Sequence, residues 1–237
     1  MSSLRPTSAL TVLLPGLAAA APVSADPLQN LGQPMQIALL LGALSLLPAL
    51  IMSVTPFLRI TLVLHFLRQA LGTQTAPSNQ ALLGLALFLT AVVTQPLTAQ
   101  LHDQSWAPYR SGKKNLEQAA SDSVRPLRSF LLKFAREKDI SLLLEISKTQ
   151  PPKTSAELDL RILVPAYMLS ELRVGFQIGA VLFFPFLVID LVVASVTLAV
   201  GMVQLPPAML SAPFKILLFV LVDGWNLVVG SLVRSFN

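Results

Sequence analysis

Long apolar runs, separated by polar stretches, set the pattern of this chain. The runs cover Ile37–Val54, Ala81–Val93, Val174–Val203 and Ile216–Val233. We predict helices for all of them, because only helices and closed barrels satisfy every backbone hydrogen bond in lipid and none of the runs alternates like a barrel strand. They fall into two pairs, so the sequence predicts two apolar helical hairpins, at residues 37–96 and 166–237, with the second pair joined near Pro206-Pro207.

A polar stretch at residues 97–165 lies between the two predicted hairpins. Its basic and acidic residues are mixed, which is typical of a small water-facing domain. Within it we predict a helix over Pro126–Ile146 that ends before Pro151-Pro152. Apolar residues recur there at helical spacing: Leu127, Phe130, Leu131, Phe134 and Ile140.

The first 25 residues have the pattern of a cleavable signal peptide. Arg5 is the positive residue, residues 9–21 are apolar, and Val23-Ser24-Ala25 is a small-residue cleavage site. We predict cleavage after Ala25 and a short N-terminal segment over residues 26–36. The alternative is a retained signal anchor, although the apolar part is shorter than the roughly 20 residues of a stable span.

This start fixes a predicted crossing order. A chain that begins outside crosses inward through the first run and leaves Arg59, His65 and Arg68 on the cytoplasmic side, as the positive-inside rule favours. The second run returns outward, so residues 97–165 are predicted to be periplasmic, and the last two runs cross in and out. His65 and His102 then lie on opposite sides and share no metal site.

The apolar runs are poor matches to simple lipid-embedded spans. Ala81–Val93 is shorter than a crossing and Val174–Val203 is longer. Prolines lie within or beside the runs, at Pro48, Pro56, Pro96 and Pro185. Helix-breaking residues at membrane depth are tolerated where neighbouring protein satisfies the freed backbone groups, so we expect these helices to pack against other chains.

The composition is typical of a membrane protein and excludes several chemical functions. Hydrophobic residues make up 54% of the 237 residues and charged residues 12%. The chain has no cysteine, so disulfides and thiolate chemistry are excluded. The net charge of +5 comes from basic residues scattered among acids, which does not favour nucleic-acid binding. No nucleotide-binding, hydrolase or metalloprotease motif occurs, so we predict a structural protein and not an enzyme, with no cofactor.

Charged residues within the apolar runs need partners. Asp190 lies in the middle of one run, where an unpaired charge costs at least ~2.5 kcal/mol. Lys215 and Asp223 are the candidates to act with it, either structurally or as a proton relay. Predicted to share one helix, they would lie about 12 Å apart at 1.5 Å per residue and could not pair with each other. We predict that Glu171, Arg173, Asp190, Lys215 and Asp223 make contacts between subunits.

Small residues indicate close helix packing. Gly175 and Gly179 have the spacing that lets two membrane helices approach closely, and Gly224 beside Trp225 suits packing next to a polar surface. Glu171 and Arg173 precede the glycine pair at the expected membrane boundary. Charges exposed on the helix surface are the alternative for these two residues.

Two stretches closely resemble the signature segments of the FliP family, the core subunits of the type III export gate of bacterial flagella and injectisomes. They are PAYMLSELRVGFQIG at residues 165–179 and PFKILLFVLVDGW at residues 213–225. The stretches APSNQ at 76–80 and LLGLALFLT at 82–90 also look like the family. The likeness therefore extends over nearly the whole chain after the signal.

The resemblance implies a fold, partners and a site. Several copies, five in the family, would pack with FliQ-like and FliR-like subunits into a helical cone, largely on the periplasmic side of the bacterial inner membrane at the flagellar basal body. FlhA-like and FlhB-like proteins would surround it, and unfolded proteins would pass through. The family's methionine-rich sealing loop corresponds to Met202, Val203 and Gln204, where only one methionine remains. Because thioethers adapt to irregular gaps, this seal would be stiffer or more polar.

Two other functions compete with a flagellar gate subunit. An injectisome gate subunit shares the same segments, but the signal-like N-terminus is typical of the flagellar branch. A small-solute or proton-coupled transporter would use Asp190 and Asp223 as relay groups. Such a transporter should show internal repeats, and the two hairpins show none.

Overall fold

The computed structural model describes residues 32–73, 75–150, 152, 154, 157–202 and 206–236. Over these residues the chain is helical and contains no strand, which confirms the all-helical prediction. The predicted signal peptide at residues 1–25 lies outside the described residues. The elements are α1 Gln33–Ser53, α2 Phe57–Ala70, α3 Asn79–Leu101, the π-helix η1 His102–Trp106, α4 Ala107–Arg110, α5 Leu116–Phe134, α6 Glu137–Ile146, α7 Leu160–Ala199, α8 Pro207–Leu221 and α9 Gly224–Arg234.

The chain divides into two compact units at Leu46 and Leu47. The described part of the first unit is most of α1, a helix of 21 residues without a charged side chain. No residue of α1 is buried. A helix that is apolar on every side is stable only when lipid or other protein surrounds it.

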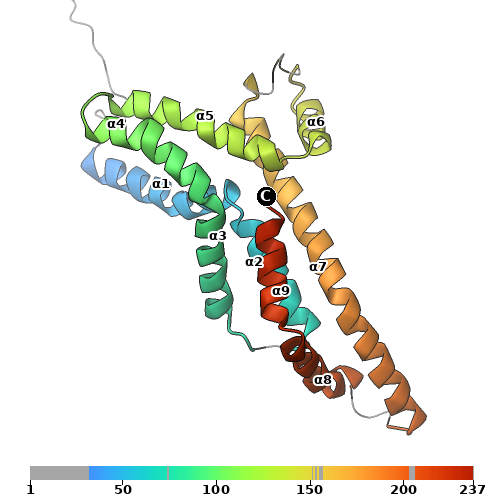
Figure 1. Cartoon of the computed structure of the whole chain (residues 1–237). Coiled ribbons are helices and arrows are strands. Elements are labelled where there is room, and N and C mark those ends of the chain that lie inside the picture. Colours follow the sequence, from blue (N-terminus) through green and yellow to red (C-terminus); the bar gives the residue numbers. More distant parts are fainter. Residues whose placement is uncertain are drawn as a thin grey trace, which may run out of the picture. The chain divides into compact units, whose positions relative to one another are not determined.

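The second unit, from Leu47 onward, is organised along α7, which has 40 residues. Helix α2 packs along α7, and α3 lies beside α2 (Figure 1). Helices α5 and α6 pack against the N-terminal half of α7, where they contact Tyr167 and Ser170. Helix α8 packs against its C-terminal half, where Ser211 contacts Asp190.

Two hydrophobic clusters hold this unit together. The larger one joins the inner face of α2 to α3, α7, α8 and α9, and it includes Val63 and Leu64, which are fully buried. The smaller one joins α5 and α6 to the start of α7 around Leu131, Leu163 and Tyr167. The region predicted as a separate polar domain is therefore packed onto α7, and its predicted limits at 97 and 165 fall inside α3 and α7.

Local signals set several helix ends. The Asn115 side chain accepts from the Gln118 amide, and the Gln118 side chain accepts from the Asn115 amide, which forms a capping box at the start of α5. Ser78 caps α3, and Asp159 caps α7 by accepting from Arg161 N at 2.9 Å.

The predicted helix over Pro126–Ile146 is wrong at its start and in its continuity. Helix α5 begins at Leu116, and Pro126 lies inside it. The chain turns at Ala135 and Arg136 before α6 begins at Glu137. The break is stabilised because the Arg136 amide donates to the Ser170 hydroxyl of α7 at 2.9 Å, which replaces a bond within the helix.

Two of the predicted apolar helices also have different lengths. The run Ala81–Val93 belongs to α3, whose 23 residues continue through Pro96, so it is not shorter than a bilayer crossing. The run Ile216–Val233 is not one helix, since α8 ends at Leu221 and the chain bends by 68° before α9. The cause is Asp223, which has the left-handed backbone angles φ 51° and ψ 52°.

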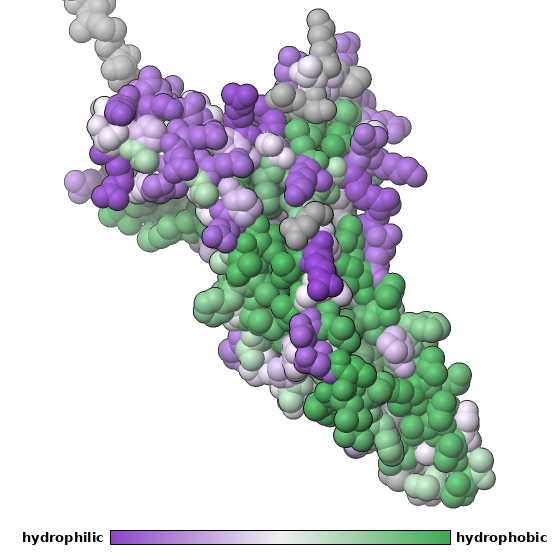
Figure 2. All heavy atoms as spheres, in the orientation of Figure 1, coloured by the Kyte–Doolittle hydropathy of each residue, from purple (hydrophilic) through white to green (hydrophobic). Residues whose placement is uncertain are grey.

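The membrane character of the chain is visible on its surface. Within the described part of the chain, three helical stretches are long and apolar enough to span a bilayer, Gln33–Ser53, Asn79–Arg110 and Leu160–Ala199, and the bent pair α8 and α9 would make a fourth. Figure 2 shows hydrophobic residues over α7 and α8 and hydrophilic residues over α4, α5 and α6. The apolar side chains of α7 thus face outward as well as inward.

Candidate functional site: buried ion pairs and the α7–α8 loop

A buried ion pair joins α2 to α7. The Arg59 guanidinium donates from Nε to Glu171 Oε2 at 2.9 Å, and Nη2 donates to the other carboxylate oxygen. The two side chains are 3% and 0% exposed. Such bidentate pairing is the geometry in which arginine binds a carboxylate most strongly, and it fixes the register of the two helices.

The same arginine holds the end of the chain. Arg59 Nη1 donates to the carbonyl and to the hydroxyl of Ser235, at 3.1 and 3.0 Å. The guanidinium carbon lies 3.9 Å from the centre of the Phe236 ring, a cation–π contact, and Phe236 is 3% exposed. Arg59 therefore binds a carboxylate, a backbone carbonyl and an aromatic face at once.

This cluster shows that the predicted crossing order is wrong. Arg59 was expected on the cytoplasmic side, and Glu171 and the chain end on the other side. The hydrogen bonds place Arg59 beside both Glu171 and Ser235. The positive-inside rule is unreliable here because Arg59 is a structural residue inside the protein and not part of an exposed loop. The assignment of His65 and His102 to opposite sides loses its basis as well.

A second ion pair joins α7 to α8. Lys215 Nζ donates to Asp190 Oδ2 at 2.6 Å, and the Ser211 hydroxyl donates to Asp190 Oδ1. Lys215 is 2% exposed. A Cβ atom on Gly72, which follows α2, would lie 3.9 Å from Lys215 Nζ, so the ammonium group is also near the C-terminal end of α2, where positive charge is favourable.

A third charged cluster joins α6 to α7. Asp139 is 1% exposed and accepts from the Ser170 hydroxyl at 2.7 Å and from Arg173 Nη2 at 2.9 Å. Of the five charged residues predicted to contact other subunits, Glu171, Arg173, Asp190 and Lys215 thus have partners within the chain. Contacts of these residues with other subunits stay a prediction. Their burial does not require such contacts, because it is already explained by the partners within the chain.

The paired glycines of α7 face α2. A Cβ on Gly175 would lie 2.8 Å from Leu62 Cδ2, and one on Gly179 would lie 2.5 Å from Phe66 Cδ2. Real Cβ atoms do not approach carbon this closely. A side chain at position 179 would therefore displace the Phe66 ring, and one at position 175 would displace the end of the Leu62 side chain, if α2 and α7 kept this distance.

The segment Asp223-Gly224-Trp225 forms the corner between α8 and α9. A Cβ on Gly224 would lie 2.2 Å from the Phe219 ring, and the Trp225 ring meets the Phe219 ring edge-on at a centroid distance of 5.4 Å. Asp223 accepts from the Asn226 side chain at 3.2 Å. Asp223 therefore acts at the corner, whereas Asp190 acts in the separate pair with Lys215.

The connection from α7 to α8 contains the predicted sealing residues. Gly201 has φ +79°, which ends α7, and Met202 is 43% exposed. Val203 and Gln204 lie outside the described residues. Apolar side chains of α7 are exposed along one stripe at helical spacing: Val181, Phe184, Val188 and Leu191.

Several partners in these clusters were not predicted from the sequence. Arg59 was assigned to a loop, and neither Asp139 nor Ser211 was predicted to contact another charged residue. Arg59 and Glu171 are 112 residues apart, so no local pattern connects them. The partner of Asp190 could be narrowed to two residues from the sequence, since Lys215 and Asp223 were the candidates to act with it.

These features define a class: an all-helical protein with membrane-length apolar helices, whose buried charges are paired between helices of one chain. A sequence profile described as the FliP family matches residues 40–232. The chain belongs to the FliP family. It is 44% identical over 213 residues to the flagellar biosynthetic protein FliP of Bacillus subtilis (strain 168), covering 90% of this chain and 96% of that one.

Two further relatives carry the same name. The flagellar biosynthetic protein FliP of Pectobacterium carotovorum subsp. carotovorum is 47% identical over 218 residues, with 89% of this chain and 83% of that one covered. The protein of that name from Caulobacter vibrioides is 46% identical over 203 residues, with 86% and 76% covered. The family predicted from residues 165–179 and 213–225 is confirmed.

Proposed function

We propose that this chain is a structural subunit of the flagellar type III export gate, through which unfolded flagellar proteins cross the inner membrane. The family match over residues 40–232 supports this function most directly. All of the relatives described above are named for flagellar biosynthesis, which favours a flagellar gate over an injectisome gate.

Several copies form the gate together with FliQ-like and FliR-like subunits, next to FlhA-like and FlhB-like proteins. The exposed stripe on α7 supports this assembly: Val181 is 76% exposed, Phe184 66% and Leu191 68%. A stripe this apolar is stable in contact with lipid or with another protein surface. Because Glu171, Arg173 and Asp190 of α7 are paired within the chain, this part of the helix can pack against neighbours without burying an unpaired charge.

The residues 202–204, which lie between α7 and α8 in the sequence, form the seal of the gate. The observation that supports this role is the exposed side chain of Met202, which follows the end of α7. An unbranched thioether adapts to a passing chain and refills the gap after it.

A transporter that relays protons from Asp190 to Asp223 has less support. Asp190 is held by Lys215 and Ser211, and Asp223 stabilises a helix corner. A relay needs ionisable groups that can exchange protons along a path, and these two carboxylates have separate partners.

Deletion of the gene tests the proposed function. The deletion strain should export neither hook nor filament protein, whereas general secretion should be unchanged, and a plasmid copy of the gene should restore export. Motility in the deletion strain would refute the flagellar assignment. Loss of general secretion together with motility would refute a role restricted to the flagellar gate.

A further inference from the structure

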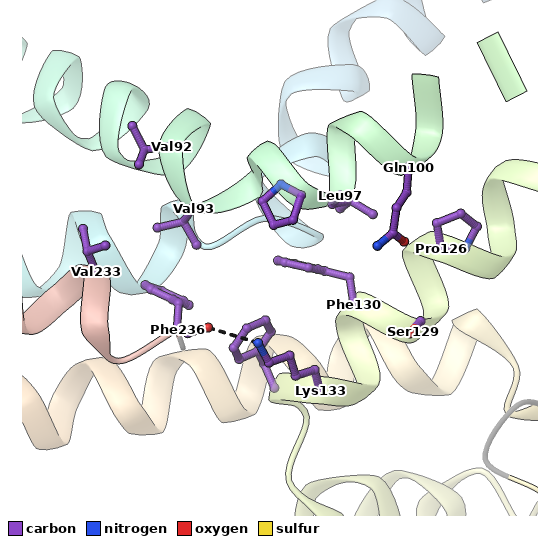
Figure 3. Close-up of a pocket in the computed structure, with 12 residues that line it drawn as sticks. Val92, Val93, Leu97, Gln100, Pro126, Ser129, Phe130, Lys133, Val233 and Phe236 are labelled. Carbon is purple, nitrogen blue, oxygen red and sulfur yellow. Dashed lines mark hydrogen bonds between the residues drawn. The ribbon is translucent and has the colours of Figure 1, made fainter. Parts of the chain in front are cut away.

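A cavity of about 390 Å³ lies between α3, α5 and the end of the chain after α9 (Figure 3). Its size falls within the range of roughly 300–1,000 Å³ that is common for small-molecule sites. None of the charged residues of the three clusters described above lines this cavity. The Phe236 ring, which Arg59 contacts, does form part of its wall.

The wall of the cavity is amphipathic. Val93 and Leu97 of α3 and Phe130 of α5 are among its apolar residues, and Figure 3 shows the Phe130 ring pointing between the two helices. The polar groups in the wall are Gln100, Ser129 and Lys133. A ligand that fits this wall has a long apolar part and a polar end.

The polar end of that ligand should be negative, because the nearby charge is positive. Lys133 is exposed, and none of the ion pairs between described residues includes it. Its Nζ donates to the Phe236 carbonyl at 3.4 Å, a long bond that leaves donor capacity.

The position of the cavity matches that of a lipid headgroup region. Helix α3 belongs to a stretch long and apolar enough to span a bilayer. The part of α3 in the wall, from Val92 to Gln100, is where its sequence changes from apolar to polar. Lysine side chains favour this boundary because the stem stays in apolar surroundings and the ammonium group reaches the polar layer.

We propose that this cavity binds one phospholipid with a negatively charged headgroup. An acyl chain occupies the apolar wall beside Val93, Leu97 and Phe130, and a phosphate oxygen accepts a hydrogen bond from Lys133 Nζ. The lipid fills the gap beside Phe236 and so stabilises the contact between α3, α5 and the chain end.

Lipid titration followed by native mass spectrometry tests the site. The protein, purified in a mild detergent with its associated subunits, is mixed with phosphatidylglycerol or with phosphatidylcholine, and the lipids retained per chain are counted. The wild type should retain one phosphatidylglycerol in preference to phosphatidylcholine. Lys133→Gln should reduce this preference about fivefold, the contribution of one lysine near an anionic lipid.

Matched variants separate the site from general effects. Lys138→Gln removes an exposed lysine of α6 and should leave the preference unchanged. Ser129→Trp fills the mouth of the cavity from an exposed position and should prevent retention of both lipids. Ser121→Trp, at an exposed position earlier in α5, should retain the lipid like the wild type.

Three results would overturn the proposal. The first is a wild-type protein that retains both lipids equally, and the second is retention that is unchanged by Lys133→Gln and Ser129→Trp. The third is a covalent dimer of a Ser129→Cys variant in native membranes, which would assign the cavity to a neighbouring copy. The chain has no other cysteine to form such a bond.

Discussion

Substitution of Arg59 by methionine should destabilise the second unit more than loss of any other charged residue. Arg59→Met leaves the Glu171 carboxylate, which is 0% exposed, without its partner. Removal of one member of a buried ion pair costs about 3–5 kcal/mol because an uncompensated charge stays behind. The variant also loses the bonds to Ser235 and the contact with the Phe236 ring.

The expected loss can be stated as a shift of the unfolding temperature. For a chain of this size 1 kcal/mol corresponds to about 2–4 °C, so Arg59→Met should lower the Tm by about 10 °C. Glu171→Leu should lower it less, because the arginine keeps its bonds to Ser235. The double variant Arg59→Met/Glu171→Leu should lose less in Tm than the two single variants lose together, because two apolar side chains then replace the pair and no buried charge is left.

Circular dichroism of the purified, detergent-solubilised complex measures these midpoints. Arg68→Met is the matched control, because this arginine of the same helix donates to the side chain of Asn79 and not to a buried carboxylate. A double variant whose loss equals the sum of the single losses would contradict the coupling of Arg59 with Glu171. So would an Arg59→Met variant as stable as the control.

Three more variants test the other features. Gly179→Ala places a Cβ against α2 and should cost about 1–3 kcal/mol, whereas Gly84→Ala meets nothing within 4 Å and should be neutral or stabilising, as read from their Tm values. Equal effects would show that the α2–α7 contact is not tight. Lys215→Met should lower the free energy of unfolding by on the order of 2 kcal/mol, read from the Tm, because it leaves the partly exposed Asp190 carboxylate without its partner. Asp190→Leu added in the same chain should recover much of this loss, and no recovery would contradict their pairing. Met202→Ala should raise ion leakage through assembled gates, and unchanged conductance would count against the seal.

Periodicity and composition predicted the helices but not how they pair. The apolar runs and the end of a helix before Pro151-Pro152 follow from local physics, so the helical class could be predicted. The start of α5 could have been predicted too, because Asn115 and Gln118 have the spacing of a capping box. The left-handed Asp223 could not, since nothing in the apolar run around it indicates a corner.

The charged clusters show why the site was harder to predict than the fold. A buried charge such as Asp190 signals that a partner exists, but the partner's identity depends on tertiary packing. Arg59 gave the opposite signal, because an arginine between two apolar runs resembles a loop residue. Its partners, Glu171 and Ser235, are 112 and 176 residues away in sequence, so only the packed structure connects them.

Native mass spectrometry of the complex extracted from flagellated cells tests the central claim most directly. An export gate subunit should be found as several copies of this chain bound to FliQ-like and FliR-like subunits, and the assembly should persist when the signal-like residues 1–25 are absent from the mature chain. A chain released as a monomer, without these subunits, under conditions that keep other membrane complexes intact would contradict a gate built from this protein.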